Sequence, residues 1–391
     1  MNSHQLFQTA CLVVLCIVGV VLTTQLSQIE ERYSAAENEQ NAVIDRSTML
    51  KTRGEARISV GDRALGIEYL NSALSLNGDD HALRSRLAEL QAESILAQPS
   101  LLTAKNALSF HALFQQVMEK QGGKTPIAVR VAFGKTLSYR GMRDEAKTVL
   151  DEAIKLAPDS ANAVLFRADI HLQENQWQAA LDQFSKAATL DDKNPLIHFG
   201  RGVALTGLNK HKESIEPLTT AAKQLNTAEP WLRLGATQAI LEAWEDAEMA
   251  FARAEVLKPK SAKILSVYAT VLAKRNRTKE AIQAAAFRAQ ATGDPVSYIQ
   301  MGNWYLKLEE FKQAAAIFGQ LSKADTKESD YECKSGYAFE KLKDVAKAQQ
   351  FYRKCQEKAT GVEARKDVLQ FATTRLAALG KQSDGSPTQK K

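Results

Sequence analysis

The stretch AEPWLRLGATQAILEAWEDAEMAFARAEVLKPKS, Ala228 to Ser261, decides the fold. Its apolar spacing is typical of two amphipathic helices folded back on each other. Gly235 on the first helix and Ala247 on the second are small enough to let the two backbones approach closely, and Phe251 fills the groove beside them. Pro259 closes the unit. A single hairpin of this kind cannot bury its apolar faces alone, so the fold depends on whether the hairpin recurs.

The hairpin recurs in one regular register. The place of Gly235 is held in turn by Gly134, Ala168, Gly202, Gly235, Ala269, Gly302 and Gly336, in steps of 33 or 34 residues. The place of Ala247 is held by Ala146, Ala180, Ser214, Ala247, Ala281, Ala314 and Ala348, with the same steps. Four residues further on, a large side chain stands in six of seven units: Leu150, Phe184, Leu218, Phe251, Ala285, Phe318 and Tyr352. The unit that begins at Ala262 has therefore lost its large residue.

The stretch resembles the tetratricopeptide repeat (TPR) family. Trp231, Leu234 and Gly235, followed by Ala247, Phe251 and Pro259, match the family pattern W-x2-L-G-x2-Y, A-x3-F and P, except that Gln238 stands in the place of the tyrosine. The resemblance implies an all-α fold, a right-handed α-solenoid of antiparallel helix pairs with seven repeats over 127–362. It also implies that partner proteins bind in the concave groove.

The same register extends to both sides of the seven repeats. Gly54 and Gly66 have the 12-residue spacing of Gly134 and Ala146, which predicts two degenerate repeats over 47–126. We expect the second of these to contain one long helix that begins after Pro99 and ends near Gly122. An amphipathic segment, 363–380, is predicted to cap the array, and the polar tail, 381–391, to be disordered.

Charge and composition limit the function classes. The formal charge is +6 on 391 residues, and basic and acidic residues alternate through most helices instead of forming a basic stripe. This pattern is typical of solvated helix surfaces and argues against nucleic acid as a partner.

The N-terminus departs from an ordinary soluble chain. Residues 6–24 carry no charge, which is about the length of a transmembrane helix, so we predict one transmembrane anchor over 1–24. A cleaved signal peptide is the alternative, but the segment has neither a basic start nor a small-x-small cleavage site. Few basic residues follow the span, which favours a single-pass bacterial inner-membrane protein with its repeats in the periplasm. An organelle membrane with repeats in the cytosol is the alternative.

Residues 25–46 are predicted to continue the membrane helix as a helical juxtamembrane stalk. Leu26, Ile29, Tyr33 and Val43 lie near a helical spacing on it. We expect this face to dock on the first repeat, although homo-oligomerisation through a short coiled coil is also open.

Motifs for chemistry are missing from the sequence. The two Gly-Lys-Thr tripeptides, at Gly123 and Gly134, lack the preceding glycine of a phosphate loop, and the six histidines show no metal-binding spacing. We therefore expect no enzyme, no catalytic or metal site and no cofactor. Cys333 and Cys355 fall on opposite helices of the last repeat at roughly matching heights, so a disulfide is conceivable in an oxidising compartment. The register argues against it, because it turns Cys333 toward the concave surface and Cys355 into the packing.

The family resemblance implies which residues line the groove. TPR proteins line it with positions 2, 5, 9, 12 and 13 of each first helix, and transfer of that register gives a partly apolar set: Leu196, Phe199, Val203, Leu232, Ala236, Ile240, Ile299, Asn303 and Leu306. The positions that hold a terminal carboxylate in chaperone-docking TPR domains carry no Lys–Asn clamp here: Val131, Lys135, Leu165, Asp169, Phe199 and Val203.

These observations lead to one hypothesis with two alternatives. The chain is expected to be a non-catalytic, membrane-anchored scaffold or adaptor that binds a peptide or helix of partner proteins in its groove and organises a membrane-associated complex. The alternatives are a signal-cleaved soluble envelope assembly factor and a cytosol-facing organelle receptor.

Overall fold

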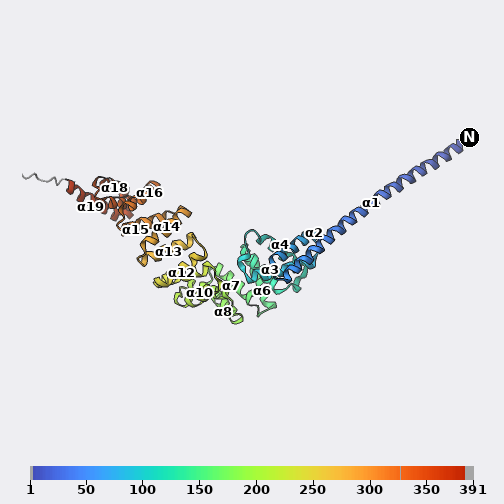
Figure 1. Cartoon of the computed structure of the whole chain (residues 1–391), viewed down its shortest axis with the longest axis horizontal. Helices are drawn as coiled ribbons and strands as arrows, with labels where there is room; N and C mark the ends of the chain where they lie inside the picture. Colours follow the sequence, from blue (N-terminus) through green and yellow to red (C-terminus); the bar gives the residue numbers. More distant parts are fainter. Residues whose placement is uncertain (1–2, 326, 384–391) are drawn as a thin grey trace, which may run out of the picture. The chain divides into compact units, whose positions relative to one another are not determined.

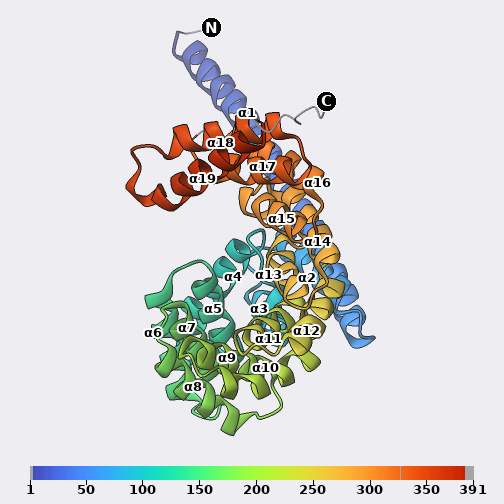
Figure 2. The same ribbon diagram turned by 90° about the vertical axis from the view of Figure 1, so that its left-hand side faces the viewer.

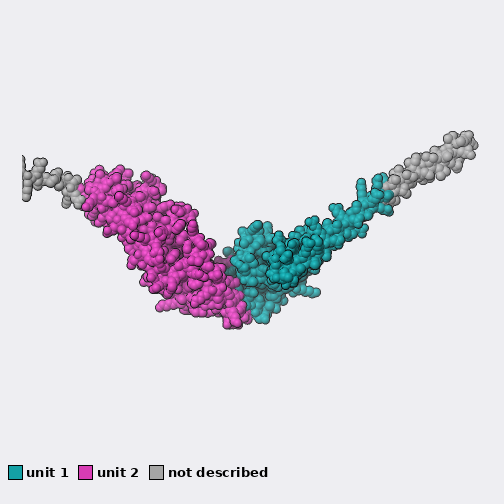
Figure 3. All heavy atoms as spheres, viewed as in Figure 1, with its two compact units in different colours: residues 1–170 teal, residues 171–391 magenta. Residues whose placement is uncertain are grey.

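A computed structural model describes residues 3–325 and 327–383, with side chains for residues 25, 27–325 and 327–380. Within these ranges the regular structure is helical throughout and contains nineteen α-helices and three short 3-10 helices (Figure 1). The chain divides into two compact units, 1–170 and 171–391, which are coloured separately in Figure 3. The division falls within α7 (Ala161–Gln173).

Unit 1 holds the first six helices. Their bounds are α1 (Ser3–Ser59), α2 (Arg63–Leu76), α3 (His81–Ala97), α4 (Ala107–Gln121), α5 (Ile127–Tyr139) and α6 (Arg143–Leu156), with 3-10 turns η1 (Pro99–Leu101) and η2 (Gly122–Lys124). Helix α1 packs along α2, and α3 contacts α2, α4 and α5. The core between them is built from buried leucines and one alanine: Leu70, Ala73, Leu83, Leu87 and Leu90.

Unit 2 is a stack of helix pairs. The bounds are α8 (Trp177–Leu190), α9 (Pro195–Gly207), α10 (His211–Leu225), α11 (Ala228–Ile240), α12 (Trp244–Leu257), α13 (Ala262–Lys274), α14 (Thr278–Thr292), α15 (Pro295–Lys307), α16 (Phe311–Ala324), α17 (Asp330–Lys341), α18 (Val345–Ala359) and α19 (Lys366–Ser383), with η3 (Glu363–Arg365). Each helix packs on the next, from α8 to α19, so successive pairs stack as in a TPR-like solenoid (Figure 2). The last helix, α19, covers α17 and α18.

The small residues that recur at the places of Gly235 and Ala247, called the small-residue ladders from here on, lie between the two helices of each pair, as predicted. All seven residues at the place of Ala247 are fully buried, and so are the large residues such as Phe251 and Phe318. A Cβ atom added at Gly302 would lie 2.6 Å from Cζ of Phe318. In five pairs the glycine of the first helix faces the large residue of its own second helix, so a small residue there sets how closely the helices approach. The prediction of an all-α array of paired helices is confirmed.

Two expectations for unit 1 need correction. The long helix predicted after Pro99 is broken, because Asn106 accepts a hydrogen bond from the backbone N–H of Thr103 (2.8 Å) and donates one to the carbonyl of Leu101 (2.8 Å). Helix α4 therefore begins only at Ala107. The stalk was expected to dock on the first repeat, but its described side chains are exposed from 25 to 46, and the first buried one is Ser47.

The predicted membrane anchor, 1–24, lies outside the residues whose side chains are described. Across the part of the chain that the structure describes, no helix combines the length and the apolar character needed to cross a membrane. The predicted disordered tail, 381–391, begins too early, because residues 381–383 still belong to α19, and the rest of it, 384–391, lies outside the described residues.

The turn inside each repeat contains a residue in the left-handed backbone region. This place recurs with the same 33- or 34-residue step and is held by Gly141, Asn175, Asn209, Glu242, Asn276, Glu309 and Lys343, with φ between 58° and 81° for each. Glycine and asparagine adopt this conformation at little cost, whereas glutamate and lysine do so at roughly 1–2 kcal/mol. Three turns of the array therefore carry an unfavourable residue.

A Glu242→Gly substitution is expected to stabilise the protein. The substitution removes the cost of the left-handed backbone at Glu242, and this cost is larger than the entropic cost of ordering a glycine. The free energy of unfolding should therefore rise by about 0.5–1 kcal/mol. Urea denaturation followed by circular dichroism measures it. Asn209→Gly, at the same place of another turn, is the matched control and should change the free energy of unfolding by less than Glu242→Gly does. A loss of stability in the Glu242 variant would show that its side chain contributes more than its backbone costs.

Candidate partner-binding groove

The nine predicted groove residues lie on three first helices of unit 2, namely α9, α11 and α15. Ile240 is 57% exposed and Asn303 is also exposed, so both are open to a partner. Six others are half-buried: Leu196, Phe199, Val203, Ala236, Ile299 and Leu306. Several of these pack against core clusters, as Phe199 does against Leu218. Helices α9 and α11 contact each other, whereas α13 stands between α11 and α15 in the stack.

Leu232 does not offer a groove surface. Its side chain is only 5% exposed and belongs to the core cluster that also contains Phe251 and Ala254. Position 5 of the first helix therefore packs against the second helix of its own repeat. An aspartate at Leu232 would place a charge in this core, so it would test the fold and not the groove.

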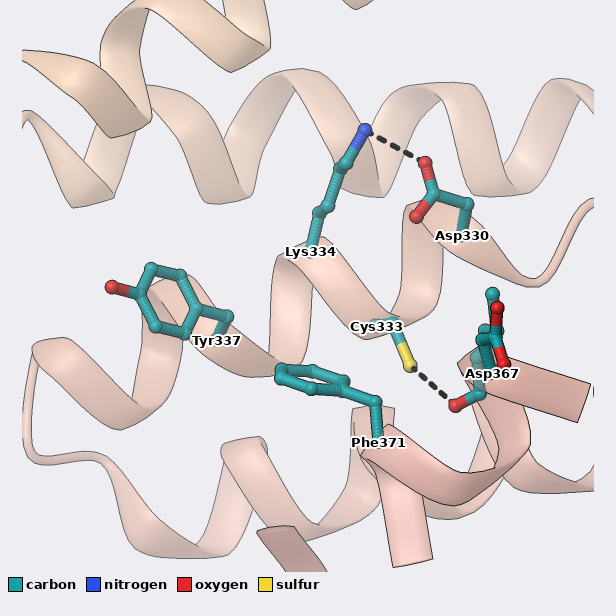
Figure 4. A pocket seen from close by; sticks show the side chains of 7 residues that line it. Asp330, Cys333, Lys334, Tyr337, Asp367 and Phe371 are labelled. Carbon is teal, nitrogen blue, oxygen red and sulfur yellow. Dashed lines mark hydrogen bonds and ion pairs between the residues drawn. The ribbon is translucent and has the colours of Figure 1, made fainter. Parts of the chain in front are cut away.

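A pocket of about 320 Å³ lies in the last repeat, where α17 continues the first-helix positions predicted to line the groove (Figure 4). Helix α17 supplies Asp330, Cys333 and Tyr337, which occupy positions 2, 5 and 9 of the last repeat. Helix α19 closes the pocket with Val368 and Phe371. The pocket therefore combines groove positions with a helix that is not part of a repeat. The sequence register could have found the α17 residues one repeat further on, but it carried no signal for those of α19.

Charges surround this mainly apolar pocket. Lys334 forms an ion pair with Asp330 (Nζ to Oδ2, 2.7 Å), and both line the wall together with Asp367. The Lys341 ammonium lies 5.4 Å from the centre of the Tyr337 ring. Asp367 is exposed, and no ion pair is formed by it among the described residues, so the rim carries one carboxylate without an ion-pair partner.

Tyr352 packs against Phe371, one of the residues that line the pocket. Its ring is fully buried and meets the ring of Phe371 edge-on, with centroids 6.0 Å apart. Its hydroxyl donates a hydrogen bond to Oε2 of Glu340 (2.9 Å). Burial raises the pKa of Tyr352, so the hydroxyl stays protonated and keeps this bond at physiological pH. Phe371 is thereby held in place with 43% of its surface exposed to the pocket side and solvent.

Cys333 and Cys355 form a disulfide, contrary to the expectation from the register. Their Cα atoms are 5.3 Å apart, and Cys333 also lines the pocket. The register argument placed position 5 on the concave surface, but Leu232 shows that this position faces the second helix. The same geometry brings Cys333 onto Cys355. Both cysteines belong to the cluster that joins α17, α18 and α19.

In unit 1, two of the positions compared with a carboxylate clamp, Lys135 and Asp169, form an ion pair. Nζ of Lys135 lies 2.6 Å from Oδ2 of Asp169, and both side chains are partly buried. Lys135 is therefore neutralised within the protein. Among the described residues, no group of three or more His, Cys, Asp and Glu is placed to hold a metal ion.

Comparison with known proteins identifies the repeats. Two models of the tetratricopeptide repeat match the chain, one over residues 131–195 and the other over residues 333–357. None of the curated proteins matches the sequence.

Several solved structures are similar to this chain, and the first of the following three reaches a TM-score of 0.50. The C-terminal part of a TPR repeat-containing protein from Cytophaga hutchinsonii is 18% identical, with a TM-score of 0.50, over 56% of this chain and 89% of that one. PilF from Pseudomonas aeruginosa is 21% identical, with a TM-score of 0.45, over 53% of this chain and 95% of that one. The Cut9–Hcn1 hetero-tetramer of the APC/C is 16% identical, with a TM-score of 0.45, over 80% of this chain, which spans 59% of that one. With its repeated small-residue ladders and paired helices, the chain is a tetratricopeptide repeat protein.

Proposed function

We propose that this protein is a non-catalytic scaffold, anchored in a membrane by residues 1–24, that binds a segment of a partner protein along the concave side of unit 2. The repeat fold is typical of protein–protein interaction. The pocket between α17 and α19 carries the proposal, because it continues the groove positions and is open to solvent. Its size suits one bulky side chain of a bound segment.

The chemistry of the pocket suggests what this segment contains. Tyr337, Val368 and Phe371 offer an apolar wall, and Asp367 adds an unpaired carboxylate at the rim. A partner segment with an apolar side chain followed by a basic residue satisfies both features. Exposed Ile240 lies on the same face by register and extends the contact toward the middle of the array.

Two observations support a periplasmic location for the repeats. Few basic residues follow the uncharged N-terminal segment. The Cys333–Cys355 disulfide is of a kind that persists in oxidising compartments and is rare in the cytosol. The disulfide disfavours the organelle receptor with repeats in the cytosol. It is equally compatible with a soluble envelope protein whose signal has been cleaved.

Photocrosslinking in intact cells tests the proposal. A benzophenone amino acid replaces Phe371 in the pocket or Ile240 on the groove, and both positions are expected to yield an adduct with the same partner. Gln313, exposed on the second helix α16, is the control position and should yield none. Equal yields of adduct at all three positions would contradict the proposal that the partner binds in the groove.

The same cells separate the membrane hypothesis from its alternative. The full-length chain should remain with membranes after a carbonate wash. A mature chain that lacks the N-terminal segment and appears in the soluble fraction would instead support the signal-cleaved envelope factor.

A further inference from the structure

A second cavity lies in unit 1, away from the groove positions. Its volume is about 440 Å³, and α2, α3, η1 and α4 surround it. Apolar side chains form its walls: Ile67, Ile95, Leu101 and Phe110. The break before α4 shapes this cavity, because the turn held by Asn106 places η1 and the start of α4 on separate sides of it. A cavity of this size with a few polar groups is typical of a ligand site.

One polar side chain in this cavity has no partner. Gln91 is 7% exposed, and its Oε1 atom is buried without a hydrogen bond to any described residue. Of the other polar groups of the wall, Asn106 makes two hydrogen bonds in its own turn, Ser94 donates to the carbonyl of Leu90, and Asn71 is exposed to solvent. A buried amide oxygen without a partner costs about 1–3 kcal/mol, so the cavity favours a molecule that donates a hydrogen bond there.

Arg63 contributes the complementary atom. Its Nη2 donates to the carbonyl of Leu90 (2.6 Å) and to Glu93 (2.7 Å), but its Nε is buried and unpartnered within the described chain. The cavity thus presents one buried donor and one buried acceptor that have no partner among the described residues. Because Glu93 already neutralises the guanidinium, the site does not require an anion.

We propose that this cavity binds an uncharged peptide segment of a partner, in which a backbone amide bridges Arg63 and Gln91 and an aliphatic or aromatic side chain fills the apolar part. An amide offers a carbonyl acceptor for Nε–H and an N–H donor for Oε1, which matches the two free atoms. Water can form hydrogen bonds with the same two atoms, but only a peptide side chain also buries apolar surface against the walls of the cavity. The site is independent of the groove in unit 2.

The test uses N-acetyl-4-fluorophenylalaninamide as the probe, followed by fluorine NMR with the full-length chain in lipid nanodiscs and empty nanodiscs as the blank. Gln91→Leu removes the acceptor at similar volume. It should raise the dissociation constant of the probe about fivefold, which corresponds to the loss of one hydrogen bond. Ala64→Trp fills the mouth from an exposed position that lines the cavity and should weaken probe binding at least about tenfold. Ala82→Trp, exposed on α3 and outside the cavity, should bind like the wild type.

Two further probes separate the alternatives. 4-Fluorotoluene has the ring without the amide and should bind the wild type and Gln91→Leu equally. The free carboxylate, N-acetyl-4-fluorophenylalanine, should bind no tighter than the amide. Gln91→Leu should melt at or above the wild type, which shows that it folds. The proposal is overturned if the amide probe does not bind the wild type, if Ala64→Trp or Gln91→Leu leaves its binding unchanged, or if the carboxylate binds tighter.

Discussion

A Gly235→Leu variant is expected to lose more than about 3 kcal/mol of unfolding free energy from unit 2. A Cβ atom at Gly235 would lie 3.0–3.1 Å from three ring carbons of Phe251, and that ring is fully buried. The further carbons of leucine have no room, so α11 must move away from α12. Because each pair of a solenoid contacts only its neighbours, the damage should stay local and divide the unfolding of unit 2 into two transitions.

Gly319→Leu is the matched control. Gly319 lies inside α16, and a Cβ atom there would meet nothing within 4 Å. Leucine has a higher helix propensity than glycine, so this variant should gain about 0.5–1 kcal/mol. Differential scanning calorimetry compares the two. A single transition at the wild-type temperature in Gly235→Leu would refute the role of the small-residue ladder.

Cys355→Ala is expected to remove about 3 kcal/mol from the stability of the C-terminal repeat. The disulfide closes a loop with a sequence separation of 22, and a loop of this length restricts the unfolded chain by about that amount. The bond also links α17 to α18, and Cys333 lines the pocket, so the pocket should become more dynamic in the variant. Hydrogen exchange of α17–α19 measures the local effect.

A reductant provides the control for this prediction. Dithiothreitol should lower the stability of the wild-type repeat toward that of the variant and leave Cys355→Ala unchanged. Cys333→Ala should behave like Cys355→Ala, since either change removes the same bond. A wild-type protein insensitive to the reductant would mean that the bond contributes nothing in solution.

The repeat register could be predicted because it depends on local spacing. Small residues at the places of Gly235 and Ala247 recur in steps of 33 or 34, and each place has the same neighbours in every repeat. Their burial in the structure follows directly from that regularity. The left-handed turn residues follow the same step. They could not be predicted from residue type at Glu242 and Lys343, because neither glutamate nor lysine favours the left-handed conformation.

The errors at Leu232 and Cys333 share one cause. Both occupy position 5 of a first helix, which the family resemblance assigned to the concave surface. In this chain the position packs on the second helix, where Ala254 and Cys355 stand. The pocket of α17 and the cavity at Gln91 could not be predicted either, because each depends on a helix outside the regular repeats, α19 or α4.

The exposed part of α1 sets the distance between the N-terminal segment and the first repeat. Its side chains between 25 and 46 that are described make no buried contact, and a helix rises 1.5 Å per residue, so this stretch is about 30 Å long. With residues 1–24 anchored as proposed, the helix would act as a spacer of fixed length. It would hold the first repeat about 30 Å above the bilayer and raise the local concentration of the array for partners that present their segment near that height.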